Sequence, residues 1–71
     1  MKYIIIDFVF PVLFTDAIEH KKMANGRFVT SAGFVKIVDG KVEVYGDSIS
    51  LKLKPDVDDA DIISLMLERK E

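Results

Sequence analysis

The chain has 71 residues, of which 49% are hydrophobic and 31% charged, with a net charge of −2 and no cysteine. This composition is typical of one small globular domain spanning residues 1–71, not of a disordered segment. The missing cysteine excludes disulfides, thiolate metal sites and cysteine nucleophiles, and it fits a reducing, cytoplasmic location. The mildly acidic charge argues against binding of duplex DNA or an anionic membrane surface.

The first element is predicted to be a strand over about residues 2–9. Its residues are apolar on both faces, apart from Asp7, and many are β-branched or aromatic. The run is too short for a membrane helix, which needs about 20 residues. Asp7 also interrupts the continuous apolar region that a signal peptide would need. Pro11 cannot donate to a β-ladder and marks a break. Residues 12–14 then form either a short second strand or a packed crossing.

A short helix is predicted over about residues 16–25. Asp16 and Glu19 have the spacing of a capping box. Asn25-Gly26 supplies a C-terminal stop.

The Asp39-Gly40 dipeptide predicts a two-residue hairpin, because both central turn residues need a positive φ. Pairing outward from this turn sets apolar against apolar, lysine against glutamate and aromatic against aromatic. The predicted pairs are Val38–Lys41, Ile37–Val42, Lys36–Glu43, Val35–Val44 and Phe34–Tyr45. Gly33, inside the first of these strands, suggests a bulge or a close backbone approach.

A third strand of the same meander is predicted after Gly46-Asp47. Ile49, Leu51 and Leu53 alternate there with polar residues, so that the meander would span about residues 28–54. A C-terminal helix is predicted over about 56–69, with acidic residues crowding its start as the helix dipole favours. Its apolar arc consists of Ala60, Ile62, Ile63, Met66 and Leu67. The fold class is therefore α+β, an antiparallel sheet of four to five strands with the C-terminal helix on one face.

No motif for catalysis is present, because the chain lacks both a nucleophile elbow and a phosphate-binding glycine loop. We therefore expect a non-enzymatic protein without a cofactor. Asp16, Glu19 and His20 would share one face of the short helix and could hold a divalent metal, which is one alternative. A capping box followed by a solvated histidine explains the same residues, and a single histidine excludes a multi-histidine zinc site.

One face of the predicted sheet mixes aromatic and basic side chains. This possible interaction face consists of Phe28, Phe34, Lys36, Lys41, Tyr45 and Lys52. Aromatics among lysines can bind single-stranded nucleic acid, which is the first alternative, ahead of the metal site. A half-exposed sheet face with ordinary cross-strand pairs explains them equally.

The main functional expectation comes from surplus apolar surface. One helix covers one face of a small sheet, yet the first strand is apolar on both faces and several aromatic residues point away from the predicted core. Exposed apolar patches usually mark interfaces, and symmetric pairing is the commonest solution. We therefore expect a protein–protein interaction module, which could be a homodimer. The alternative is an ordinary monomer in which the short helix and residues 10–14 cover this surface.

Three stretches, residues 11–20, 27–34 and 45–51, resemble a group of short bacterial and phage-associated proteins to which no activity is assigned. The resemblance covers most of the chain and carries no catalytic motif. It implies a cytoplasmic, accessory protein of prophage origin and adds no site residues.

Overall fold

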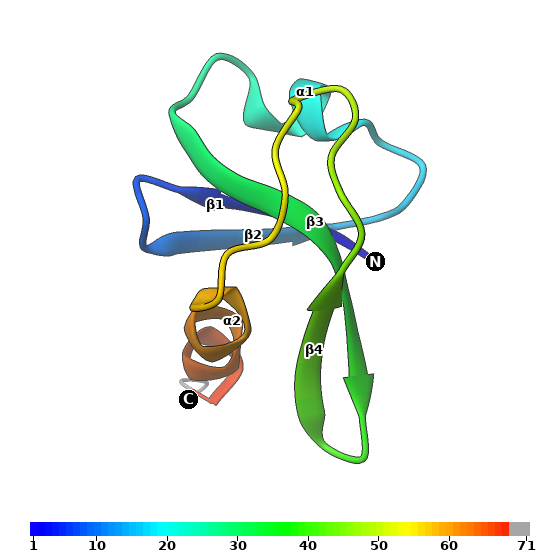
Figure 1. Ribbon diagram of the computed structural model, residues 1–71, viewed down its shortest axis with the longest axis vertical. Coiled ribbons are helices and arrows are strands. Elements are labelled where there is room, and N and C mark those ends of the chain that lie inside the picture. Colours follow the sequence, from blue (N-terminus) through cyan, green and yellow to red (C-terminus); the bar gives the residue numbers. More distant parts are fainter. Residues whose placement is uncertain (69–71) are drawn as a thin grey trace.

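Four antiparallel strands form one sheet, in the order β2-β1-β3-β4, in the computed structural model, which describes residues 1–68 (Figure 1). The strands are β1 Lys2–Ile6, β2 Phe10–Phe14, β3 Val29–Val38 and β4 Lys41–Tyr45. The helices are α1 His20–Ala24 and α2 Asp59–Glu68. The predicted α+β class, with an antiparallel sheet and a C-terminal helix, is confirmed.

Strand β1 lies in the middle of the sheet, paired with β2 on one side and with β3 on the other. Its side chains alternate between the two faces, and those of Tyr3, Ile4 and Ile5 are at most 1% exposed. A central strand covered on both faces has apolar residues throughout, which explains the pattern seen in the sequence.

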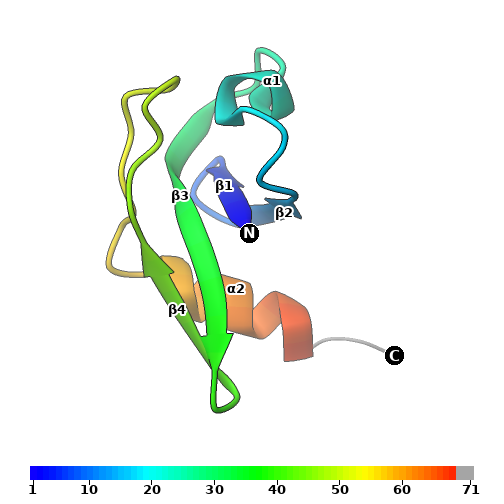
Figure 2. The same cartoon turned by 90° about the vertical axis from the view of Figure 1, so that its right-hand side faces the viewer.

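Two clusters of buried side chains lie on opposite faces of the sheet. The first contains Ile4, Ile6, Phe14, Ala24 and Ala32, with Leu51 and Leu53 packed against it. The second contains Tyr3, Ile5, Val35 and Ile63, with Val42, Val44 and Leu67 packed against it. Figure 2 shows α1 and α2 on opposite sides of the β1–β2 pair. The apolar residues on both faces of β1 are therefore covered within the chain.

The β3–β4 hairpin has the predicted turn and register. All five predicted pairs are present, from Phe34 opposite Tyr45 to Val38 opposite Lys41. Asp39 and Gly40 have φ values of 53° and 79°, as a two-residue turn of this kind requires. The close approach predicted at Gly33 is also found, because a Cβ there would lie 2.8 Å from Cγ of Pro55.

The predicted third strand of the meander is wrong. In place of a strand, residues 46–54 fold into a loop whose one ladder contact is the bridge between Ser48 and Leu53. Lys52 adopts a φ of 58°, which reverses the chain, and Ile49 is 89% exposed. Leu51 packs instead against the cluster on the α1 side. Of the alternating apolar residues, Leu51 and Leu53 pack against the core while Ile49 stays exposed.

The predicted start of the short helix is also wrong, since α1 begins at His20 and Glu19 makes no side-chain cap. Residues 15–18 form a turn closed by a 3.2 Å hydrogen bond from the Ile18 amide to the Thr15 carbonyl. The Asp16 carboxylate lies 3.1 Å from the amino group of Met1. The predicted stop is confirmed, because Asn25 has a φ of 49°.

Other boundaries differ from prediction by a few residues. Strand β1 ends at Ile6, and β2 runs through Pro11, which is tolerated because β2 is an edge strand. Helix α2 begins at Asp59, and the predicted end at residue 69 lies outside the described residues.

Candidate interaction surface

Phe34 and Tyr45 stack on each other, with ring centroids 5.6 Å apart and ring planes 26° apart. The Lys36 ammonium lies 5.4 Å from the centre of the Tyr45 ring, and 3.9 Å from the Glu43 carboxylate. The hairpin thus brings together the central members of the predicted aromatic and lysine face. The contacts are the cross-strand pairs that stabilise an ordinary sheet.

Phe34 is only partly accessible. Its ring packs edge-on against His20, with centroids 5.6 Å apart. On another side it meets Gly46, where an added Cβ would lie 2.8 Å from the ring. Within this pair, Tyr45 is therefore the ring that remains accessible, with 46% of its surface exposed.

The remaining members of the predicted face lie apart from this pair. Lys41 lies at the hairpin turn and Lys52 in the loop 46–54. Phe28 lies beside the β1–β2 turn, where its carbonyl accepts a hydrogen bond from the Asp7 amide. The structure therefore does not gather the six predicted residues into one surface.

His20 is a buried core residue, only 3% exposed. Its Nε2 lies 2.8 Å from the Gly33 carbonyl oxygen, and its ring packs edge-on between Phe14 and Phe34. Asp16 and Glu19 are exposed and precede the helix. Within residues 1–68, no group of three histidine, cysteine or acidic side chains is placed to hold a metal.

The carboxylate of Asp59 is the best-connected buried polar group, at 1% exposure. It accepts hydrogen bonds from the Tyr3 hydroxyl at 2.6 Å, the Ser31 hydroxyl at 2.9 Å and the Asp56 amide at 2.9 Å. Burial, the hydrogen bond to Asp59 and the nearby negative charges raise the pKa of the Tyr3 phenol well above its ordinary value. Because each buried side chain of the network has a hydrogen-bond partner within the chain, we interpret the network as an anchor for α2. The three-residue spacing of Asp56 and Asp59 was the sequence signal for it.

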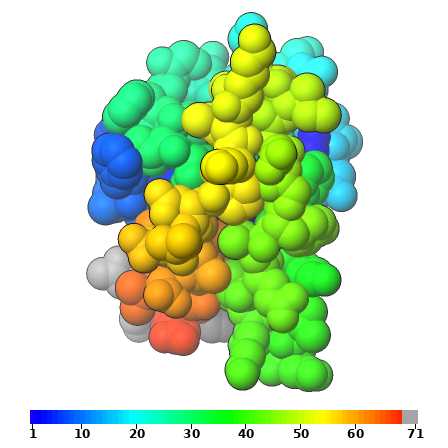
Figure 3. Space-filling view, in the orientation of Figure 1, coloured from blue at the N-terminus to red at the C-terminus, as the bar shows by residue number. Residues whose placement is uncertain are grey.

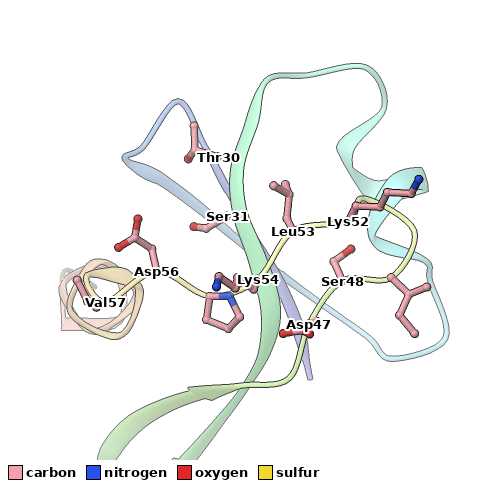
Figure 4. Close-up of a pocket in the computed structure, with 11 residues that line it drawn as sticks. Thr30, Ser31, Asp47, Ser48, Lys52, Leu53, Lys54, Asp56 and Val57 are labelled. Atoms are coloured by element: carbon pink, nitrogen blue, oxygen red, sulfur yellow. The ribbon is translucent and has the colours of Figure 1, made fainter.

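A broad hollow of about 860 Å³ lies between β3 and the segment that leads from β4 to α2 (Figure 4). Its buried hydroxyls already have partners, since Ser31 donates to Asp59 and Ser48 accepts from the Leu51 amide. Its charged residues balance, with Asp47 and Asp56 against Lys52 and Lys54. No buried polar side chain in the hollow is left free to recognise a ligand.

A different surface, at the β1–β2 turn, is unusually apolar. Phe8, Val9, Phe10 and Phe28, here called the turn cluster, are each 60–65% exposed. The rings of Phe8 and Phe28 meet edge-on, with centroids 6.2 Å apart. Figure 3 shows the turn, in blue, adjoining the green start of β3 on the surface. Because an aromatic side chain presents about 150–250 Å², three such rings leave roughly 300–500 Å² in water.

The turn that carries this cluster is strained and firmly held. Asp7 and Phe8 have φ values of 52° and 68°, and a left-handed conformation costs a bulky residue about 1–2 kcal/mol. The Val9 amide bonds the Ile6 carbonyl at 3.1 Å, closing the turn. The Phe8 amide bonds Thr30 Oγ1 at 3.0 Å. Two successive positive φ values are also what a tight hairpin turn requires, so the β1–β2 connection itself sets this conformation.

Sequence reasoning identified only Phe28 of the turn cluster. The sequence predicts Phe8 and Val9 as the end of the strand over residues 2–9, because the run is rich in apolar β-branched and aromatic residues. Asp7, the one polar residue in the apolar run, was the available signal for a turn at this point.

Comparison with family models, with curated proteins and with solved structures finds no match to this chain. No helix within residues 1–68 is both long and apolar enough to cross a membrane. The functional argument therefore rests on the surface geometry.

Proposed function

We propose that this protein is a non-enzymatic protein–protein interaction module and that the turn cluster is its contact surface. The main support is that Phe8, Phe10 and Phe28 are about two-thirds exposed. They lie beside a sheet whose two faces are already covered by buried clusters. Their combined area reaches the few hundred Å² at which exposed apolar patches are usually functional.

The rigidity of the turn supports this proposal. Thr30 Oγ1 accepts the Phe8 amide and donates to the Ile5 carbonyl at 3.2 Å, so it joins the turn to both β1 and β3. A preorganised surface loses less conformational entropy when it binds a partner. The chain thus holds the Phe8 side chain outward, 65% exposed, on a turn that hydrogen bonds fix to the sheet.

A cytoplasmic location and an accessory, prophage-associated role belong to the same proposal. The lack of cysteine fits the cytoplasmic location. The prophage-associated role rests only on the resemblance of residues 11–20, 27–34 and 45–51 to short phage-associated proteins. An interaction module needs neither a cofactor nor a buried catalytic group.

Photo-crosslinking tests the contact surface directly. Phe10 is replaced by benzoyl-phenylalanine, and the matched control carries the same group at Ile49, which is 89% exposed in the loop 46–54. We expect a covalent protein adduct in cells from position 10 and none from position 49. Equal adduct from both positions, or none from position 10, would overturn the proposal.

A further inference from the structure

We propose that the partner of the turn cluster is a second copy of this chain, docked about a two-fold axis. This inference rests on the proposed function, because it names the occupant of the same surface. A two-fold contact sets one patch against itself, so the patch must be complementary to itself in both apolarity and charge.

The border of the turn cluster has this complementarity. Asp7 precedes Phe8 and Arg27 precedes Phe28, so opposite charges border the same aromatic pair. Both residues are exposed. The ion pairs formed by the described residues involve other groups, joining Met1 to Asp16 and Lys36 to Glu43. A two-fold axis through the cluster can set Asp7 of each copy against Arg27 of the other.

A partner that presents charges of one sign would repel either Asp7 or Arg27. A second copy offers an opposite charge to each of them. The small net charge of −2 also gives little general repulsion between copies. Charge complementarity therefore favours self-association over binding to a uniformly acidic or basic surface.

The size of the cluster indicates a reversible dimer. A standard interface buries about 800 Å² on each partner, and the roughly 300–500 Å² of exposed aromatic surface would form its centre. The bordering charges and turn backbone would supply the rim. Because each copy has its own buried clusters, the monomer can fold alone and the dimer depends on concentration.

Docking occurs through side chains and not by joining the two sheets. The nearest free sheet edge is β2, where Pro11 lacks an amide hydrogen and breaks any continuous backbone ladder with another copy.

Sedimentation velocity with charge-reversed variants tests this arrangement. Arg27→Glu leaves an acidic residue at both positions 7 and 27, and Asp7→Lys leaves a basic residue at both. We expect each variant to self-associate at least tenfold more weakly than the wild type, and an equimolar mixture to regain wild-type association. Lys36→Glu, a charge reversal on the distant β3–β4 hairpin, serves as the control and should dimerise normally. Circular dichroism confirms that each variant is folded.

Several outcomes would overturn the inference. A wild-type chain that stays monomeric up to millimolar concentration excludes a second copy as the partner, as does a dimer that neither charge variant weakens. A mixture of the two charge variants that fails to regain association excludes the contact between Asp7 of one copy and Arg27 of the other. If the adduct from position 10 contains a different protein, the second copy is wrong while the proposed function stands. If position 10 gives no adduct, both fail.

Discussion

The hydroxyl of Tyr3 donates a 2.6 Å hydrogen bond to Oδ2 of Asp59, which lies 56 residues further along the chain. This contact joins the central strand to the first turn of α2, and the side chains of both residues are at most 1% exposed. Oδ1 of the same carboxylate accepts the Ser31 hydroxyl from β3. One buried carboxylate therefore fixes the position of α2 relative to two strands.

Removing this carboxylate should destabilise the whole fold. Asp59→Ala leaves two buried hydroxyls and one amide without their partner, so we expect the free energy of unfolding to fall by about 3 kcal/mol or more. Tyr3→Phe removes one bond to a charged acceptor and should cost about 1.5–3 kcal/mol. Urea denaturation measures both. Tyr45→Phe, on an exposed ring, is the control and should change stability by less than about 0.5 kcal/mol. A Tyr3→Phe loss as small as that of the control would contradict the anchor.

Stability should fall with rising pH above the ordinary tyrosine pKa of about 10. Burial, and then the hydrogen bond and charge of Asp59, raise the pKa of Tyr3 in the folded state. The folded chain consequently keeps a proton that the unfolded chain releases, so this contribution is complete below pH about 10 and is lost as pH rises further. Urea midpoints at several alkaline pH values should fall more steeply for the wild type than for Tyr3→Phe. Parallel slopes for the two proteins would refute the prediction.

Two glycines should respond to substitution for different reasons. Gly33 is confined by Pro55 and by the Tyr45 carbonyl oxygen, 3.0 Å from an added Cβ, so Gly33→Ala and Gly33→Asn should each cost about 1–3 kcal/mol. At Gly40 a Cβ meets nothing within 4 Å, but the φ of 79° penalises ordinary side chains. Gly40→Ala should therefore cost about 1 kcal/mol and Gly40→Asn less, because asparagine tolerates this conformation. Thermal or urea unfolding gives all four values. Equal costs for alanine and asparagine at Gly40 would contradict a backbone cause.

The Phe34 and Tyr45 pair should prove structural. Phe34→Ala removes a ring packed against His20 and Tyr45, and it should lower the free energy of unfolding by about 2 kcal/mol or more. Tyr45→Ala should cost less, because its ring is more exposed. Neither variant should change the affinity for a mixed-sequence single-stranded oligonucleotide, measured by fluorescence anisotropy. Salt-dependent binding that Tyr45→Ala abolishes without unfolding the chain would instead favour a nucleic-acid function.

Local signals predicted the parts of the fold that depend on neighbouring residues. Asp39-Gly40 fixed both the turn and the register of β3 and β4, because any slip would mispair every side chain. The apolar arc of α2 predicted its buried face, with Ile63 completely buried and Leu65 exposed at 62%. These features need no knowledge of distant contacts.

The errors arose where distant packing decides the structure. The loop 46–54 alternates as a strand does, yet Leu51 and Leu53 are drawn to the cluster around Ile4 on the central strand. The turn at Asp7 and Phe8 depends on bonds from Thr30 and Phe28, more than twenty residues away. The turn cluster could not be recognised until that turn was placed, which is why the predicted face contained only Phe28 from it.

The most direct measurement is the solution mass of the wild-type chain and of Phe10→Ser, by light scattering behind a sizing column, at low and high salt. We expect the 8.0 kDa wild-type chain to approach twice its mass as concentration rises, at both salts, because the centre of the contact is apolar. Phe10→Ser should remain a folded monomer. A wild-type monomer at every concentration, or a dimer that Phe10→Ser leaves intact, would contradict self-association through the turn cluster.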